Sequence, residues 1–241
     1  MPAEPKLTRS NLERELKAAG DPNRAGGAAA FFKTGKGDYG EGDVFLGIST
    51  PVLRKTALRY RGLSFEDIER LLQSKIHEHR SAAVEILVAQ YKLGDEEQRS
   101  EIVGFYLRNT ACFDNWDLVD GSAPYILGEH LRAHPRAILR RLARSKSLWE
   151  RRIAMVATLR LVRNGELDDA LVVAKLLLDD DHDLIHKAVG WVLREVGRKD
   201  RARLLVFLET HYERLPRTAL RYAIEHFSLE QRKKMLAGKF A

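Results

Sequence analysis

A tryptophan and an aspartate one helical turn apart are the residues of this sequence best suited to chemistry. Trp116 and Asp120 lie at positions i and i+4 of the segment FDNWDLVDGSAP, so a helix there presents both on one face. A carboxylate beside an indole is the reverse of ordinary core packing. The pair suits a site where positive charge develops next to a flat group, because a fixed carboxylate stabilises such charge.

Basic residues and a tryptophan recur along the chain at a nearly constant interval. Each stands near the start of an expected helix, before small and then larger apolar residues. The positions are Arg80, Trp116, Arg152, Lys187 and Arg217, at successive intervals of 36, 36, 35 and 30 residues. A two-helix unit of about 30–40 residues has the size of HEAT-type repeats. We therefore predict an all-α fold, a right-handed α-α superhelix of HEAT-like repeats.

Equivalent positions of stacked repeats line one continuous face, usually the concave one. One helical turn further along, that face carries Val84, Asp120, Val156, Trp191 and Arg221. This predicts a basic concave groove interrupted by two indoles and one carboxylate. Two alternatives stay open here: each tryptophan packs one helix on another, or the arginine-rich surface is simply solvated.

The rest of the chain also has helical periodicity, with almost no strand pattern. The helices expected are 7–19, 22–33, 51–60, 65–74, 77–93, 96–109, 114–132, 136–144, 147–163, 167–178, 183–197, 200–212, 216–226 and 229–237. Capping residues mark starts at Asp21-Pro22, Ser49-Thr50-Pro51 and Ser64. Stops are expected at Gly94, Gly165 and Gly197. We expect one repeat domain over 1–241, with an N-terminal helix in 1–24 and a C-terminal helix and basic tail in 228–241.

Composition narrows the class of partner. The 241 residues include no apolar run near the roughly 18 needed to span a bilayer. The start of the sequence lacks a signal-peptide core, and the single cysteine, Cys112, fits a reducing compartment, which predicts a cytoplasmic protein. Residues 1–120 carry 17 basic and 19 acidic residues, whereas residues 121–241 carry 24 and 15. A basic half favours a polyanionic partner, most often nucleic acid.

Three other patterns are interpreted as structural. The glycines of GKGDYG (35–40) match GxGxxG, but no strand precedes them, so a loop that packs Phe45 and Leu46 is favoured over a nucleotide site. His182 and His186 lie beside four aspartates, but the pattern lacks a defined third metal ligand. The acidic run more simply caps a helix that begins near Asp183. Cys112 is expected to be buried.

The chain resembles the AlkD-type DNA alkylation repair glycosylases, which are built of HEAT-like repeats. The resemblance covers about residues 25–226, and its most specific strings are FFKTGKGDYGEGDVFLGISTPVLRK, NWDLVD, LWERRIAM and HDLIHKAVGWVLRE. It implies removal of positively charged N3- or N7-alkylated purines from duplex DNA without metal, cofactor or base flipping. We also expect a monomer in a bacterial-type cytoplasm, near the nucleoid. The chain departs from this pattern in its longer GKGDYGEGD insert and in Phe32, where some members carry tyrosine.

The resemblance also assigns roles to single residues. Asp120 corresponds to the catalytic carboxylate, Trp116 and Trp191 to indoles that pack on the damaged nucleotide, and Arg152 to an arginine near its phosphate. Lys187, Arg80, Arg217 and Arg221 are the remaining candidates for DNA contacts. Two other functions stay open: a non-catalytic protein that binds damaged DNA, and a HEAT-like scaffold that binds proteins.

Overall fold

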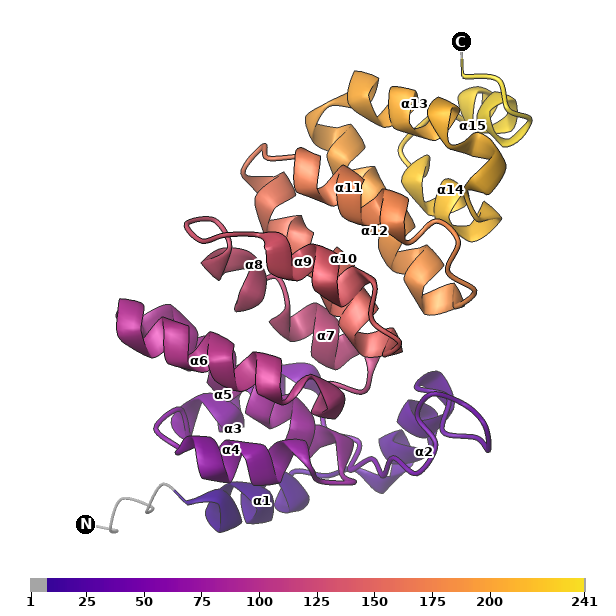
Figure 1. The fold of residues 1–241 in the computed structure, drawn as a ribbon. Helices are drawn as coiled ribbons and strands as arrows, with labels where there is room; N and C mark the ends of the chain where they lie inside the picture. Colours follow the sequence, from indigo (N-terminus) through magenta and orange to yellow (C-terminus); the bar gives the residue numbers. More distant parts are fainter. Residues whose placement is uncertain (1–7, 241) are drawn as a thin grey trace. The chain divides into compact units, whose positions relative to one another are not determined.

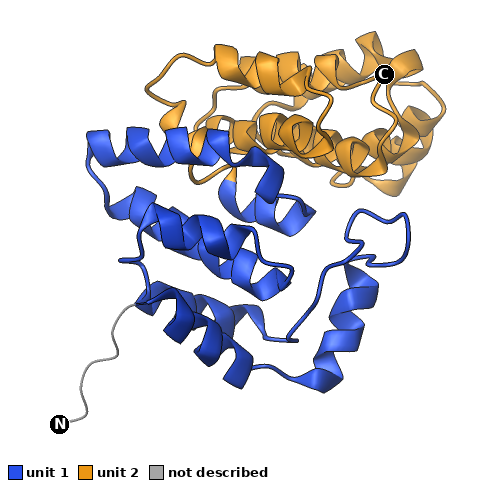
Figure 2. Cartoon of the chain, turned by 60° about the horizontal axis from the view of Figure 1, so that its bottom comes forward, with its two compact units in different colours: residues 1–122 blue, residues 123–241 orange. Residues whose placement is uncertain are grey.

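Residues 8–240, which the structure describes, fold almost entirely into helices (Figure 1). The structure is a computed structural model. The described residues contain no β-strand, and one isolated parallel bridge pairs Val44 with Ile76. The predicted all-α class is therefore confirmed. The chain divides into two compact units, residues 1–122 and 123–241 (Figure 2), while a single repeat domain over 1–241 stays a prediction.

The first unit is built around one long buried helix, α5. Its helices are α1 (Arg9–Ala18), α2 (Pro22–Phe31), α3 (Thr50–Arg59), α4 (Phe65–Leu72), α5 (His77–Leu93), α6 (Glu96–Arg108), the 3-10 helix η1 (Thr110–Cys112) and α7 (Trp116–Ser122). Helix α5 contacts α3, α4, α6 and α7. By contrast, α2 contains no buried residue, so this helix depends on its two ends and the following loop for attachment.

The second unit repeats a pair of helices along the chain. Its helices are α8 (Leu127–His130), α9 (Ala137–Ala143), α10 (Leu148–Arg163), α11 (Asp168–Leu176), α12 (Asp183–Lys199), α13 (Arg201–Thr210), the 3-10 helix η2 (Tyr212–Arg214), α14 (Arg217–Ala223) and α15 (Leu229–Leu236). Helix α10 packs on α9, α11 and α12, and α12 packs on α13 and α14. The second helices of successive pairs thus form one layer, as the helical-repeat prediction requires.

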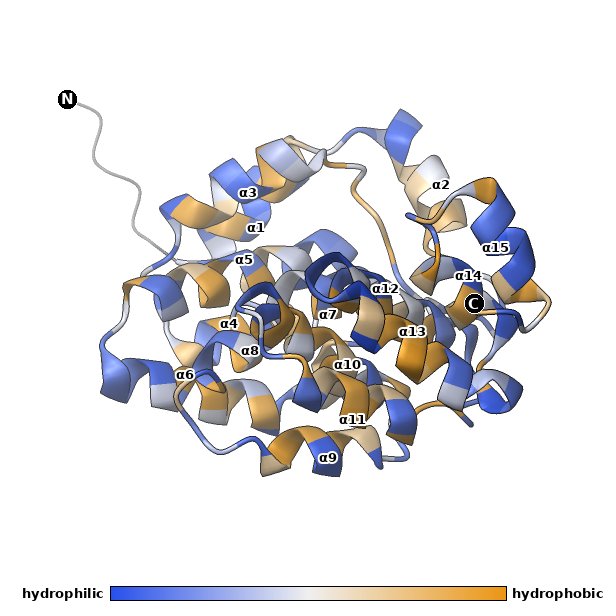
Figure 3. Cartoon of the chain, turned by 90° about the horizontal axis from the view of Figure 1, so that it is seen from above, coloured by the Kyte–Doolittle hydropathy of each residue, from blue (hydrophilic) through white to orange (hydrophobic). Residues whose placement is uncertain are grey.

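Most predicted helix boundaries are confirmed within two residues. Asp21 and Ser64 cap α2 and α4 through their side chains, and Gly94 and Gly165 follow the ends of α5 and α10. Most helices interleave apolar and polar residues (Figure 3), as expected of helices with one buried face. Among the described residues, none of the helices is long and apolar enough to cross a membrane.

Three predictions about helix ends differ from the structure, the simplest being the helix expected to end at residue 226, which ends at Ala223. The expected helix 114–132 is instead two short helices, α7 and α8, with a turn around Pro124 between them. Proline has no N–H for the helical ladder, and its ring disfavours the helical conformation of the residue before it. The expected stop at Gly197 is also absent, because α12 continues to Lys199. A β-carbon on Gly197 would collide with the side chain of Leu204 in α13, so this glycine allows close helix packing.

Candidate functional site

Helix α7 presents Trp116 and Asp120 in the first unit. The buried Asn115 begins the helix: its side-chain oxygen accepts from the N–H of Trp116 at 2.8 Å, and its carbonyl accepts from Val119 at 3.2 Å. Trp116 and Asp120 are both half-buried. Their i, i+4 spacing places them one turn apart on one side of the helix, so the structure brings the two predicted residues together.

The indole of Trp116 is held by two phenylalanines from the end of α2. The ring of Phe32 stacks on it at 5.3 Å with an interplanar angle of 18°, and Phe31 meets it edge-on at 5.7 Å. Phe31 is itself 65% exposed, which places an aromatic ring at the surface beside the indole. The indole is therefore fixed in orientation while part of its surface stays accessible.

Asp120 acts electrostatically on the core of the first unit. Burial raises the pKa of the Tyr106 phenol, and the negative charge of Asp120 raises it further. The Tyr106 hydroxyl lies 3.0 Å from the Ser122 hydroxyl, which in turn donates to the carbonyl of Leu118. The Asp120 carboxylate is thus close enough to low-dielectric surroundings for its charge to act strongly.

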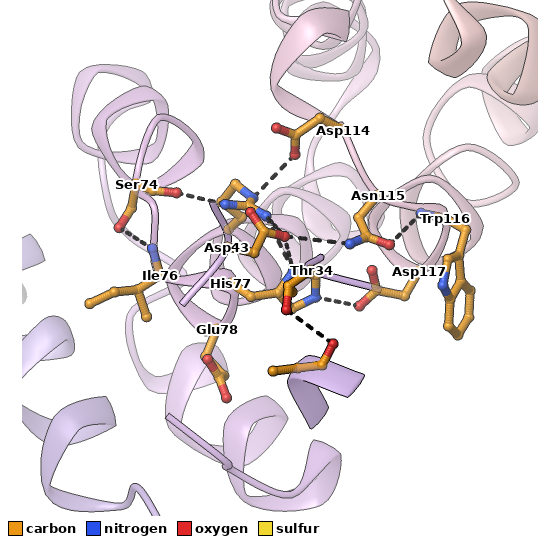
Figure 4. Close-up of polar contacts among 12 residues, drawn as sticks. Thr34, Asp43, Ser74, Ile76, His77, Glu78, Asp114, Asn115, Trp116 and Asp117 are labelled. Carbon is orange, nitrogen blue, oxygen red and sulfur yellow. Dashed lines mark hydrogen bonds and ion pairs between the residues drawn. The ribbon is translucent and has the colours of Figure 1, made fainter. Parts of the chain in front are cut away.

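Behind Trp116, a buried histidine joins three segments of the first unit (Figure 4). His77, in the first turn of α5, places Nε2 2.8 Å from Oδ2 of Asp117 and Nδ1 3.5 Å from Oδ2 of Asp43. Burial opposes its protonation, but the hydrogen bonds to both aspartates outweigh that cost and raise the pKa of His77 to about 9. His77 is therefore an imidazolium at neutral pH.

Arg80 belongs to the same buried cluster, which makes a phosphate contact unfavourable. The residue is 3% exposed; Nη2 lies 2.6 Å from Asp43, Nη1 donates to the Ser74 carbonyl at 2.8 Å, and Nε lies 3.3 Å from Asp114. Burial raises the pKa of Asp43, but its bonds to His77 and Arg80 more than offset this, so that pKa is lowered. The structure thus speaks against Arg80 as an open DNA contact and for a role inside the fold.

Glu78, which follows His77 in the first turn of α5, fixes the loop after α2. The carboxylate of Glu78 accepts from the backbone N–H groups of Leu46, Gly47 and Ile48, at 2.9, 2.8 and 3.3 Å. Gly47 has a φ of +79°, and a β-carbon there would collide with the Asp21 carbonyl, so only glycine fits. The loop therefore has a defined course, with Phe45 buried and Leu46 half-buried as predicted.

Helices α2, α3, α5 and α7 and the loop after α2 line a pocket of about 410 Å³ in the first unit. Its lining is mainly aromatic and aliphatic, with carboxylates at intervals; it includes Phe31, Phe32, Phe45, His77, Trp116 and Asp117. The size is within the usual range of small-molecule sites, and aromatic walls are the ordinary surface for stacking a flat ring.

In the second unit, Arg152, Lys187 and Trp191 lie on the neighbouring helices α10 and α12. Arg152 is 5% exposed and donates from Nη1 to the carbonyl of Leu184 at 2.6 Å, so it joins α10 to the first turn of α12. Lys187 is half-buried and pairs with Asp183 at 2.7 Å, and Trp191 is half-buried. Burial of Arg152 favours a structural contribution, whereas Lys187 and Trp191 keep accessible surface.

Arg217 and Arg221 stand at the surface of α14, one turn apart. Arg217 donates from Nη1 to the Leu236 carbonyl at 2.7 Å. Helices α12 and α14 approach closely at Gly190, where a β-carbon would lie 2.6 Å from the Ala219 carbonyl oxygen. The second unit therefore carries predicted site residues on three adjacent helices, at the register that the repeat interval indicated.

Sequence patterns missed His77, Asp117, Asp43 and Asp114 as parts of the site. The available signal was the run of four polar residues HEHR (77–80) before the largely apolar SAAVEILVA; the structure buries all four. Four adjacent buried polar residues require partners. Those partners lie 37 and 40 residues away from Arg80 and His77, so spacing alone did not reveal them.

The structure also shows the glycine-rich segment, the acidic run before α12 and Cys112, for which the sequence predicts structural roles. No strand precedes residues 35–40, which form turns. Helix α12 begins at Asp183 as predicted, but its N-cap is the imidazole of His182, which accepts from the N–H of Leu184. Cys112 is half-buried rather than buried, and burial raises the pKa of its thiol.

Comparisons with known proteins agree with this architecture. The sequence matches the family model described as DNA alkylation repair enzyme over residues 12–227. Among solved structures, it is similar to a predicted DNA alkylation repair enzyme from Enterococcus faecalis, with a TM-score of 0.68 and 18% identity. That similarity covers 87% of this chain and 97% of the other, and at such identity it concerns the fold. The curated proteins contain no match.

Proposed function

The chain belongs to the DNA alkylation repair enzyme family, and on that premise we propose that it is a monofunctional DNA glycosylase. Its substrates are positively charged N3- or N7-alkylated purines in duplex DNA. It hydrolyses the N-glycosidic bond without flipping the damaged base into a pocket. It acts as a monomer in the cytoplasm, on nucleoid DNA, and the step uses no metal or cofactor.

One observation carries the proposal: α7 holds a half-buried carboxylate one turn from an indole whose orientation two other rings fix. As the glycosidic bond breaks, its electron pair goes to the cationic base, which leaves neutral. Positive charge then develops on the deoxyribose, an oxocarbenium-like species. The Asp120 carboxylate stabilises that charge and orients the water whose oxygen bonds to the sugar carbon while its proton goes to solvent.

The tryptophans and cations hold the nucleotide in place. Trp116 and Trp191 pack against the sugar and backbone of the damaged nucleotide. Arg217, Arg221 and Lys187, which keep accessible surface, contact phosphates, and such contacts position the duplex without reading its sequence. Arg152 is buried and bonds to the Leu184 carbonyl, so we propose that it acts near the lesion's phosphate by fixing the start of α12, on which Lys187 lies, rather than by direct contact.

Release of free base tests the proposal directly. Wild-type protein is incubated with a duplex containing one N7-methylguanine, and the released base is quantified. Asp120→Asn keeps the side-chain shape but removes its charge, so we expect the rate to fall on the order of 10²- to 10³-fold, as for other preorganised electrostatic groups. Asp38→Asn, in the exposed part of the loop, is the matched control and is expected to behave like wild type.

One result would contradict catalysis, and another would contradict the role of Asp120. Wild-type protein that releases no base above background is not a glycosylase for this lesion, and salt-dependent duplex binding would then identify a non-catalytic DNA-binding protein. Equal release by wild type and Asp120→Asn would remove Asp120 from the reaction.

A further inference from the structure

We propose that His77 is a positioning residue for the reaction: it sets the orientation of the Trp116 indole through Phe32 and Asp117. His77 does not touch the nucleotide. Its effect on base release rests on the proposed function, whereas its effect on the indole does not.

The first route from His77 to Trp116 runs through aromatic rings. The imidazole centroid lies 4.7 Å from the ring of Phe32 and 4.7 Å from that of Phe45. Phe32 in turn stacks on Trp116 at 5.3 Å. Because α2 has no buried residue, these ring contacts are a main attachment of its C-terminal end. Where the imidazole moves, Phe32 moves, and the indole loses the surface on which it stacks.

The second route runs through the backbone of α7. Nε2 of His77 lies 2.8 Å from Oδ2 of Asp117, the residue that directly follows Trp116. Oδ1 of Asp117 has no hydrogen-bond partner among the described residues, so the bond to His77 is the hydrogen bond that holds this carboxylate. Asn115, which precedes Trp116, reaches Asp43 of the same cluster at 3.5 Å. Trp116 is therefore flanked on both sides by residues joined to the His77 cluster.

The charge of His77 is what joins the segments. On its own helix it faces Arg80, at 3.3 Å; from the loop it faces Asp43, and from α7 it faces Asp117. Two carboxylates from two segments meet at one imidazolium, and charged hydrogen bonds of this kind are about twice as strong as neutral ones. Deprotonation removes the charge that attracts Asp43, 3.5 Å from Nδ1, and leaves the 2.8 Å bond between Nε2 and Asp117 with a neutral donor, which is weaker.

Co-titration of His77 and Trp116 tests the positioning role. Nuclear magnetic resonance spectra of the wild type are recorded from pH 6.5 to 10, following the His77 imidazole and the three tryptophan indole N–H signals. We expect the Trp116 signal to shift with the same midpoint as His77, near pH 9. Trp149 and Trp191, in the second unit, are internal controls expected to show no such midpoint.

A variant separates this coupling from a general effect of pH. Asp117→Asn keeps an oxygen that accepts from His77 but removes the carboxylate charge, so the His77 midpoint is expected to fall. The Trp116 midpoint should fall with it. A Trp116 signal that does not follow His77 in the wild type, or that keeps its midpoint when that of His77 moves, would overturn the proposal.

The kinetic test compares two histidines of one helical turn. His77→Gln is expected to lower the rate constant of base release at saturating enzyme on the order of tenfold to a hundredfold, since small misplacements of positioning groups have effects of that size. Affinity for undamaged duplex should stay within about twofold. His79→Gln alters the neighbouring ring, which bonds to Ser74 instead, and should keep the wild-type rate.

The outcomes distinguish this inference from the proposed function. A wild type that releases no base refutes the glycosylase, and the co-titration still decides the role of His77. A wild type that releases base while folded His77→Gln keeps its rate refutes the positioning role alone. If His77→Gln does not fold, base release by Asp117→Asn is measured across pH instead. Its rate should fall as pH rises through the His77 midpoint of that variant, which is lower than in the wild type.

Discussion

Replacing Arg80 by methionine distinguishes a buried structural cation from a DNA contact. Methionine keeps most of the side-chain length and removes the guanidinium that lies 2.6 Å from Asp43 and 3.3 Å from Asp114. Asp43 then keeps the more distant His77 Nδ1, at 3.5 Å, as its cation, and Asp114, whose side chain is 45% exposed, loses its cation, in a site where Arg80 is only 3% exposed. Breaking such a buried pair from one side costs about 3–5 kcal/mol, whereas an exposed pair contributes about 0–1 kcal/mol.

We therefore expect Arg80→Met to lower the free energy of unfolding by about 3–5 kcal/mol. Urea titration followed by circular dichroism measures this change. Duplex affinity, measured by fluorescence anisotropy at several salt concentrations where the variant is folded, should keep the wild-type slope. Arg221→Met is the matched control at the surface of α14. It should leave stability within about 0.5 kcal/mol and lower the slope of log affinity against log salt by about 0.9, the value for one phosphate contact.

The opposite result for Arg80 would refute the reasoning. Wild-type stability together with a salt slope reduced by about 0.9 would mean that the guanidinium leaves Asp43 and Asp114 to contact a phosphate. A smaller loss of stability in the double variant Arg80→Met/Asp43→Asn than in Arg80→Met alone is expected, because the second change removes one uncompensated charge.

Two further changes test packing and pH dependence. Gly190→Ala should lower the thermal midpoint, with a loss of about 1–3 kcal/mol, because its β-carbon would lie 2.6 Å from the Ala219 oxygen; Gly26→Ala, with open space around it, should be neutral or stabilising by up to about 1 kcal/mol. The pKa of His77 is raised from 6.5 to about 9 on folding, so its stabilisation is complete below pH 6.5 and is lost as pH rises through 9. Urea titrations across that range should show a decline in wild type that His77→Gln lacks; equal declines would contradict the shift.

Local patterns were sufficient to predict the elements of this fold. Apolar spacing and caps such as Asp21-Pro22 gave helix positions within about two residues, because both signals act inside a single helix. The errors at Gly197 and around Pro124 have a different origin. A glycine such as Gly197 can end a helix or allow a neighbouring helix to pack closely. The contact with Leu204 on α13 shows that Gly197 does the second, and this contact is not visible in the local sequence.

The site was predictable where its residues share a helix or a repeat register. Trp116 and Asp120 share α7, so their spacing was sufficient to place them together. Arg80 has the same register, and its basic side chain indicated a groove. Its partner Asp43 comes from a loop 37 residues earlier, and no periodicity marks such a residue. The sequence therefore indicated where Arg80 lies on the helix but not that carboxylates bury it.

The loop between α2 and α3 contains an exposed stretch, residues 35–38, between segments that are attached to the rest of the first unit. Across this stretch, the Gly40 N–H donates to the Lys33 carbonyl. Further on, the Val44 N–H donates to the Lys75 carbonyl, and Glu78 accepts from the N–H groups of residues 46–48. Residues 35–38, between Lys33 and Gly40, are exposed. Chain length in that stretch is thus independent of the geometry around Trp116, so the segment can lengthen or carry an inserted label while the indole keeps its place.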